Sequence, residues 1–192
     1  MTQHGPWQIV QSHDVYRDPW IDVRRDDVIR PDGQRGTYSV VNLKPGVCVV
    51  AMDEGHDVYL TEEFHYGVGR TTIEAVSGGI ETGEDALLTA QRELQEEIGL
   101  RAGDWTDMGI VDPFTSNVVS PTRLYLARGL QFGEHAQEGT ETIRCVKMSL
   151  ADAARKVLDS EITHGPSAVL LLKVQLLVTL GQLGTAKHEG RP

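Results

Sequence analysis

The sequence is short of basic residues and cysteine, and it has no apolar run long enough to cross a membrane. Lysine and arginine number 18 against 28 acidic residues, which gives a formal net charge of −10 at pH 7. A chain this acidic is poorly suited to a nucleic-acid backbone, so we expect a small-molecule ligand and neither a nucleic-acid nor a membrane partner. If that ligand is a polyphosphate, divalent metal offsets the repulsion more effectively than basic side chains do.

The two cysteines and the seven histidines show no metal-site spacing. Cys48 and Cys145 both lie among β-branched residues, which favours small buried side chains. The longest apolar stretch, residues 169–180, is interrupted by Lys173 and Gln175 and predicts a helix packed on the core. The N-terminal residues show no basic region followed by an apolar one, so we expect no secretory signal and a cytoplasmic location.

The expected elements run from strands to a helix, back to strands, and end in helices. The turn signal Pro31-Asp32-Gly33 predicts a hairpin across residues 20–50, and hence a β-rich N-terminal arm. Further strands are expected at residues 47–52, 57–63, 71–76, 106–111, 122–130 and 142–148, and helices at residues 83–99, 150–158 and 167–180. This order predicts an α+β domain in which helices cover a mixed sheet.

The segment 83–99 carries the clearest helical pattern. Apolar residues recur at spacings of three and four, at Ala86, Leu87, Ala90, Leu94 and Ile98. Thr82 with Asp85 three residues later predicts a capping box, and Gly99 predicts a left-handed end.

Three glutamates share one face of this helix. At about 100° per residue, Glu97 lies about 40° to one side of Glu93, and Glu96 lies about 60° to the other. Arg92 can pair with Glu96, but one guanidinium cannot neutralise three carboxylates. Mg²⁺ prefers oxygen ligands and is typically held by a few carboxylates together with substrate phosphates, so this face is a candidate metal site. A solvated charged face is the alternative.

The surrounding segment resembles the Nudix box. That motif requires Gly, five residues, Glu, seven residues, then Arg-Glu-apolar-any-Glu-Glu-any-Gly-apolar. The matching positions are Gly78, Glu84, Arg92, Glu93, Leu94, Glu96, Glu97, Gly99 and Leu100, with no departure. Such a match arises by chance on the order of 10⁻¹⁰ to 10⁻⁹ per starting position, so the signal is specific.

The resemblance implies the Nudix fold, a mixed β-sheet sandwiched between helices, with the box holding Mg²⁺ (or Mn²⁺) at a diphosphate. It implies four metal ligands, namely Ser77 through its carbonyl, Glu93, Glu96 and Glu97. It also implies that Glu84 and Arg92 form an orienting pair and join Glu97 in the catalytic set, while Gly78 lets the backbone approach the metal.

Beyond the box, residues from about 20 to 180 resemble the ADP-ribose pyrophosphatase branch of the family. The softer matches include EEFHYGVGRTTIEAVSGG and SEITHGPS. In that branch the N-terminal β-arms are exchanged in a homodimer, and their aromatic side chains stack on the nucleobase. Trp20 and Tyr38 match those aromatics, with core packing as the alternative. The mobile-loop glutamate of the branch matches Glu141 best, and Glu138 next.

Two positions depart from the branch. His65 stands where many ADP-ribose pyrophosphatases have an arginine, and Val76-Ser77-Gly78 replaces a Pro-Ala-Gly type of approach. Histidine cannot reproduce the bidentate phosphate contacts of arginine. We therefore expect an altered diphosphate or sugar contact at His65, for which Arg70 and Arg123 could compensate, and we take His65 and Arg70 as candidate substrate-binding residues.

These observations favour Mg²⁺-dependent hydrolysis of ADP-ribose or a related nucleoside diphosphate sugar to a nucleoside monophosphate and a sugar phosphate. Another nucleotide substrate, such as a dinucleoside polyphosphate or a reduced dinucleotide, is the alternative. A non-catalytic nucleotide-sugar sensor would be expected to lose a metal glutamate, and none is lost. The expected organisation is a dimerising arm at residues 1–45, a Nudix hydrolase domain at 46–183 and a flexible tail at 184–192.

Overall fold

The computed structural model describes residues 1–133 and 143–183. The expectations for Glu138, Glu141 and the tail at 184–192 lie outside these residues. Contacts divide the chain into two compact units. The first unit joins Met1–Pro45 to Asp112–Pro121, and the second joins Gly46–Val111 to the chain from Thr122 onward. The sequence did not indicate that a segment after residue 111 belongs with the N-terminal arm.

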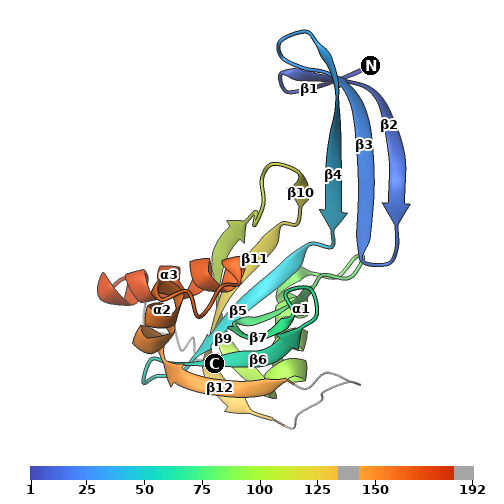
Figure 1. Ribbon diagram of the computed structural model, residues 1–192. Coiled ribbons are helices and arrows are strands. Elements are labelled where there is room, and N and C mark those ends of the chain that lie inside the picture. The colour runs from blue at the N-terminus through green and yellow to red at the C-terminus, as the bar shows by residue number, and fades with distance from the viewer. Residues whose placement is uncertain (134–142, 184–192) are drawn as a thin grey trace, which may run out of the picture. The chain divides into compact units, whose positions relative to one another are not determined.

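The first unit is a β-sheet whose described strands follow the order β1-β2-β3-β4-β10 (Figure 1). These strands are β1 (Thr2–His4), β2 (Trp7–Arg17), β3 (Ile21–Ile29), β4 (Arg35–Leu43) and β10 (Val118–Val119). All neighbours are antiparallel except β10, which runs parallel to β4. The turn predicted at Pro31-Asp32-Gly33 connects β3 to β4, and Gly33 takes the positive φ of 80° that this tight reversal requires.

The second unit contains a mixed sheet in the order β12-β6-β5-β11-β9, with β7 paired to β6 and β8 paired to β5. Its strands are β5 (Gly46–Met52), β6 (Asp57–His65), β7 (Arg70–Glu74), β8 (Val76–Gly79), β9 (Leu100–Val111), β11 (Thr122–Phe132) and β12 (Arg144–Ser149). Strands β5 and β11 are parallel, and the other pairs are antiparallel. The predicted α+β class with a mixed sheet is confirmed.

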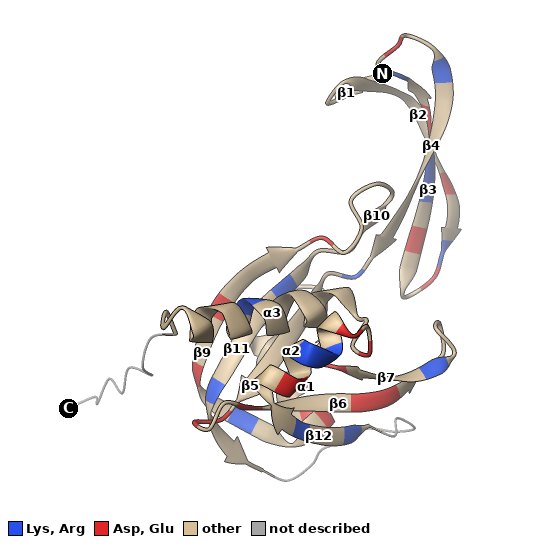
Figure 2. Cartoon of the chain, turned by 60° about the vertical axis from the view of Figure 1, so that its left-hand side comes forward, with Lys and Arg blue, Asp and Glu red and all other residues tan. Residues whose placement is uncertain are grey.

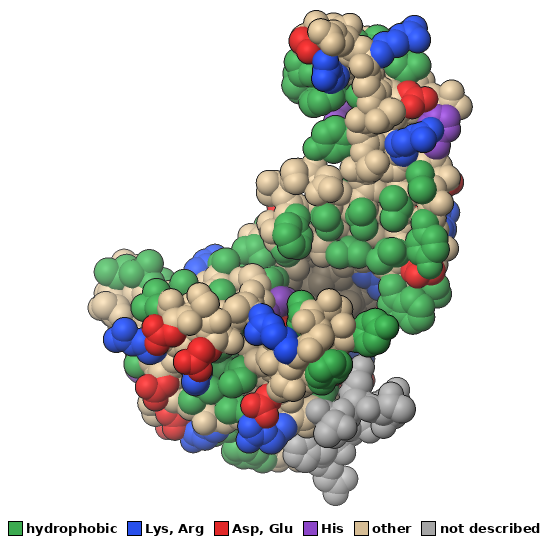
Figure 3. Space-filling model, in the orientation of Figure 1, with side chains coloured by type: hydrophobic (Ala, Val, Ile, Leu, Met, Phe, Trp, Pro, Cys, Tyr) green, Lys and Arg blue, Asp and Glu red, His purple; other side chains and the backbone are tan. Residues whose placement is uncertain are grey.

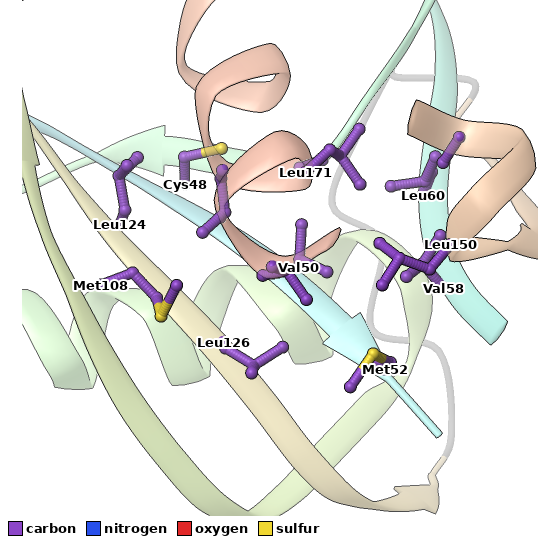
Figure 4. Packing of buried hydrophobic residues seen from close by; sticks show 14 of the residues in the cluster. Cys48, Val50, Met52, Val58, Leu60, Met108, Leu124, Leu126, Leu150 and Leu171 are labelled. Carbon is purple, nitrogen blue, oxygen red and sulfur yellow. The ribbon is translucent and has the colours of Figure 1, made fainter. Parts of the chain in front are cut away.

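Strand β5 is buried on both faces because helices cover both faces of the sheet. The even-numbered side chains from Cys48 to Met52 join an apolar cluster with α2 (Leu150–Leu158) and α3 (Gly165–Thr179), as Figure 4 shows. The odd-numbered side chains from Val47 to Ala51 join a second cluster with α1 (Ala86–Ile98). Successive strand side chains point to opposite faces, so a strand covered on both sides needs a continuous apolar run.

Helices α2 and α3 pack together on one face of this sheet (Figure 2). The sequence predicted α2 with its observed bounds, whereas α3 begins at Gly165, two residues before the predicted start. The early start is possible because Pro166 has a φ already suited to the first helical turn and no N–H group left unpaired there. No helix of the described residues has both the length and the apolar character to cross a membrane.

The ends of α1 confirm one prediction and correct another. Gly99 ends the helix in the left-handed conformation with φ 66°. The predicted capping box between Thr82 and Asp85 is wrong, because Asp85 is itself the N-cap and accepts the N–H groups of Leu87 and Leu88. An aspartate in this position satisfies the free N–H groups of the first turn without a second capping residue.

The cysteines differ in their environment. Cys48 is fully buried, as expected, whereas Cys145 is exposed. Cys145 lies on β12, which ends the described strand order of the sheet, so the apolar residues around it do not imply burial.

Candidate active site

The last residues of β8 lie directly against the middle of α1. A Cβ atom added to Gly78 would lie 2.1 Å from both Cδ and Oε1 of Glu93. A side chain at this position would displace the Glu93 carboxylate, so the close approach depends on glycine. The carboxylate of Glu93 is thereby held against the backbone that follows Ser77.

One guanidinium connects three carboxylates of the box. Nε of Arg92 lies 3.1 Å from Oε1 of Glu84, and its Nη1 lies 2.7 Å from Oε1 of Glu93 and 2.9 Å from Oε2 of Glu96. Glu84 belongs to the loop before α1, whereas the other three residues are on the helix. Arg92 therefore fixes the loop to the helix and sets the direction of two candidate metal ligands.

The ion pairs affect the carboxylates unequally. Hydrogen bonds from Arg92 lower the pKa of Glu84 to about 2, so this carboxylate is fully ionised at neutral pH. Burial raises the pKa of Glu93, and the charge of Arg92 only partly opposes that effect. The hydrogen bond with Glu84 in turn raises the pKa of Arg92. An added cation would oppose this rise and favour the ionised form of Glu93.

Glu97 lies one helical turn beyond Glu93 and is partly buried. Its negative charge also acts on the buried Cys48 thiol of β5. Burial raises the pKa of Cys48 to about 12, and the negative charges of Glu74 and Glu97 add to this rise. Both carboxylates therefore act on the same point of β5.

The donor set fits a hard divalent cation. It consists of carboxylate oxygens on one helix beside the backbone at Gly78, and Arg92 alone does not balance the charge. Among the described residues, no three histidine, cysteine, aspartate or glutamate side chains form a ready-made metal cage. Mg²⁺ commonly keeps several waters and takes further oxygens from substrate phosphates, so an incomplete protein cage is compatible with it.

The expected substrate contacts His65 and Arg70 face each other across the β6–β7 hairpin. Nε2 of His65 lies 3.3 Å from Oε1 of Glu74, and the Arg70 guanidinium donates a 2.8 Å hydrogen bond to the Thr163 hydroxyl. Arg123, the possible supplement, is paired with Asp107 at 2.5 Å. His65 is partly exposed and Arg70 is exposed, so both side chains can be reached from solvent.

The two aromatic candidates of the first unit lie in different surroundings. Trp20 is 70% exposed, in the turn before β3. Tyr38 packs edge-on against Trp7 at 5.5 Å and donates a hydrogen bond to the Ser116 carbonyl. Tyr38 pairs with Asp26, five positions along β3 from Ile21, which is about 17 Å at roughly 3.4 Å per residue. Trp20 and Tyr38 of one chain therefore cannot stack on the same base.

Comparison with known proteins gives the family. Residues 42–165 match the NUDIX domain, and residues 7–41 match the nucleoside diphosphate sugar hydrolase N-terminal domain. The chain belongs to the NUDIX family. The resemblance seen in the box is thus confirmed across most of the chain, and the protein is a NUDIX pyrophosphohydrolase.

Relatives of this NUDIX protein include two ADP-ribose pyrophosphatases. The one from Mycobacterium tuberculosis is 31% identical over 184 residues, which cover 93% of this chain and 87% of the relative. The one from Bacillus subtilis is 25% identical over 87% of this chain and 91% of its own length. A crystal structure of an ADP compounds hydrolase matches 95% of this chain and 100% of its own, with a TM-score of 0.79 and 21% identity. That last similarity establishes the fold alone.

The NUDIX box explains one part of the site and leaves another part unassigned. The motif predicted Arg92 and the box glutamates by their spacing. It did not predict the contact between Glu74 and His164; the other carboxylate oxygen of Glu74 faces His65. No sequence pattern joins these two residues, because they are 90 positions apart and come together only when α3 packs on the sheet.

Proposed function

We propose that this enzyme hydrolyses the pyrophosphate bond of ADP-ribose or a related nucleoside diphosphate sugar, giving a nucleoside monophosphate and a sugar phosphate. The observation that carries the proposal is the complete box, in which Glu93 lies against Gly78 and is held by Arg92. The N-terminal match to nucleoside diphosphate sugar hydrolases and the two related ADP-ribose pyrophosphatases support the substrate class.

The proposed metal is Mg²⁺, with Mn²⁺ as a substitute, held by Ser77 through its carbonyl and by Glu93, Glu96 and Glu97. Such an ion, when bound, neutralises phosphate charge and lowers the pKa of a bound water. Arg92 keeps the carboxylates of Glu93 and Glu96 oriented before the ion arrives, and Glu84 fixes Arg92. Pre-orientation of this kind reduces the reorganisation needed during the reaction.

The remaining contacts are proposed for the organic parts of the substrate. His65 and Arg70 are donors for the diphosphate or the terminal sugar, and Trp20 is a stacking surface for the nucleobase. Tyr38 is the second aromatic candidate, although its ring and hydroxyl already have partners. Glu141, which lies outside the described residues, is proposed as a further catalytic carboxylate.

A homodimer is part of the proposal. Hydrophobic side chains gather on one face of the strands of the first unit (Figure 3). Large hydrophobic side chains of this unit that are more than 40% exposed include Val10, Val15, Tyr16 and Trp20. Exposed hydrophobic side chains gathered on one face are typical of an interaction site. Sedimentation of a single species of about 21 kDa at micromolar concentration would remove the dimer from the proposal.

The decisive experiment is phosphatase-coupled turnover of a nucleotide panel by the wild type, Glu97→Gln and the control Glu161→Gln. Glu161 is also a paired carboxylate, but it pairs with Lys156 and is not part of the box. We expect metal-dependent release of a nucleoside monophosphate from nucleoside diphosphate sugars, a fall of at least about 10²-fold in Glu97→Gln, and normal turnover in the control.

The panel also includes dinucleoside polyphosphates and reduced dinucleotides. Turnover of these compounds without turnover of nucleotide sugars would replace the proposed substrate class. Binding of a nucleotide sugar without any turnover would favour a sensor instead.

A further inference from the structure

Glu74 occupies the junction between β7 and β8, and each of its carboxylate oxygens faces an imidazole. Oε1 lies 3.3 Å from Nε2 of His65 and accepts a 2.6 Å hydrogen bond from the Thr72 hydroxyl. Oε2 lies 3.1 Å from Nδ1 of His164, the residue before α3. The Glu74 side chain is only 12% exposed. A carboxylate with partners on both oxygens and so little exposure has one orientation.

Ser167 extends this network to the backbone of the same junction. Its fully buried hydroxyl accepts a 2.9 Å hydrogen bond from the Ala75 N–H and lies 2.8 Å from Nδ1 of His164. An ionised carboxylate can only accept, so the Nδ1 proton of His164 is directed to Glu74 and Ser167. The hydroxyl proton of Ser167 then points away from the ring, on the side where Sγ of Cys48 lies 3.9 Å away.

His164 is used for this network rather than for its own helix. It stands at the N-cap position of α3, where serine, threonine, asparagine or aspartate would cap the free N–H groups. Its side chain makes no capping hydrogen bond. Burial lowers the pKa of His164, which agrees with a neutral ring that serves as a hydrogen-bond donor.

The junction held in this way leads directly into the candidate metal site. Glu74 and Ala75 precede Val76, Ser77 and Gly78, and the last of these carries the backbone on which Glu93 rests. From Ala75 to Ser77 the chain extends only about 7 Å, at roughly 3.3 Å per residue. A shift of the Ala75 backbone is therefore transmitted to the Ser77 carbonyl.

We propose that Glu74, His164 and Ser167 are positioning residues that hold the Ser77 carbonyl and the Gly78 backbone in register with Glu93. The inference rests on the proposed function, because it takes the Ser77 carbonyl to be a metal ligand. These residues act through the backbone and not by touching the substrate. Their loss weakens metal binding by about 10-fold, the lower end of what outer partners of metal ligands contribute.

The test is Mn²⁺ binding to the substrate-free full chain, followed by electron paramagnetic resonance, with melting temperature measured in parallel. The variants are Ser167→Ala, Glu74→Gln, His164→Ala and His164→Asn. Asparagine places an amide N–H near the position of Nδ1, so His164→Asn keeps the donor that alanine removes. The control is Lys147→Gln, which breaks ion pairs with Asp53 and Asp57 elsewhere in the second unit.

We expect about 10-fold weaker Mn²⁺ binding in the three loss variants, near wild-type binding in His164→Asn and no change in the control. Turnover at limiting Mn²⁺ should fall in the loss variants and recover at high Mn²⁺. If Ser167→Ala does not fold, Glu74→Gln and the two His164 variants decide the outcome.

Wild-type Mn²⁺ affinity in folded Ser167→Ala or Glu74→Gln overturns the inference. So does equal weakening in Lys147→Gln, because the effect would then follow stability alone. Failure of the wild type itself to bind Mn²⁺ is a different result, since it refutes the metal-dependent function on which the inference depends.

Discussion

Replacement of Gly78 by alanine tests the closest contact in the site. The new Cβ would lie 2.1 Å from the Glu93 carboxyl group, whereas ordinary contact begins at 3.4 Å, so the two must separate by 3.4 − 2.1 = 1.3 Å. A misplacement of about 1 Å can cost about 10²-fold in rate, and overpacking costs about 1–3 kcal/mol of stability. We therefore expect Gly78→Ala to lose both turnover and melting temperature, at about 2–4 °C for each kcal/mol.

The double variant separates this clash from other effects. Glu93→Ala removes the side chain that Gly78→Ala would strike, so the stability losses should not add. Calorimetry of both single variants and the double variant measures the coupling directly. Wild-type stability and turnover in Gly78→Ala would refute the reasoning, and so would a stability loss that persists undiminished in the Glu93→Ala background.

Three further predictions concern other parts of the chain. Arg92 lowers the pKa of Glu84 to about 2 from the ordinary 4.5, so the wild type should be more stable than Glu84→Gln by a constant amount above about pH 5, and this difference should disappear as the pH falls toward 2. Urea denaturation at a series of pH values measures the difference, and a difference that grows on acidification would contradict the prediction. At pH 8 a disulfide reagent should modify exposed Cys145 in the folded chain but buried Cys48 only in denaturant, since burial raises the pKa of Cys48 to about 12. Reaction of both thiols without denaturant would contradict this. Trp20→Ala should raise KM roughly 5- to 150-fold without changing kcat or melting temperature if the exposed ring stacks on the base, and an unchanged KM would exclude that role.

The sequence predicted those elements in which apolar residues recur at a regular spacing. Helix α1 was found because its apolar residues repeat every three or four positions, and its end was found because Gly99 takes a left-handed conformation. Strand β2 was missed because most of its residues are exposed, so no alternation of polar and apolar residues marks it. The start of β9 was missed because the strand begins at Leu100, immediately after the helix.

The site divides in the same way. The box residues lie within one short stretch of sequence, so a motif could predict their proximity. Ala75 and Ser167 meet only because α3 packs on the sheet, which brings together residues 92 positions apart. Such proximity depends on how distant elements pack together, so it cannot be predicted from the local sequence.

Strand β5 has a consequence for how this enzyme can be altered. One side chain from it touches the cluster beneath α1, and the next touches the cluster beneath α2 and α3. Strand β5 therefore packs on one face against the layer that contains the box and on the other face against the layer that contains Ser167. Laboratory evolution of substrate preference should leave β5 intact and draw its variation from the exposed residues 66–69 between β6 and β7, where a Cβ atom added at Gly67 has no neighbour within 4 Å.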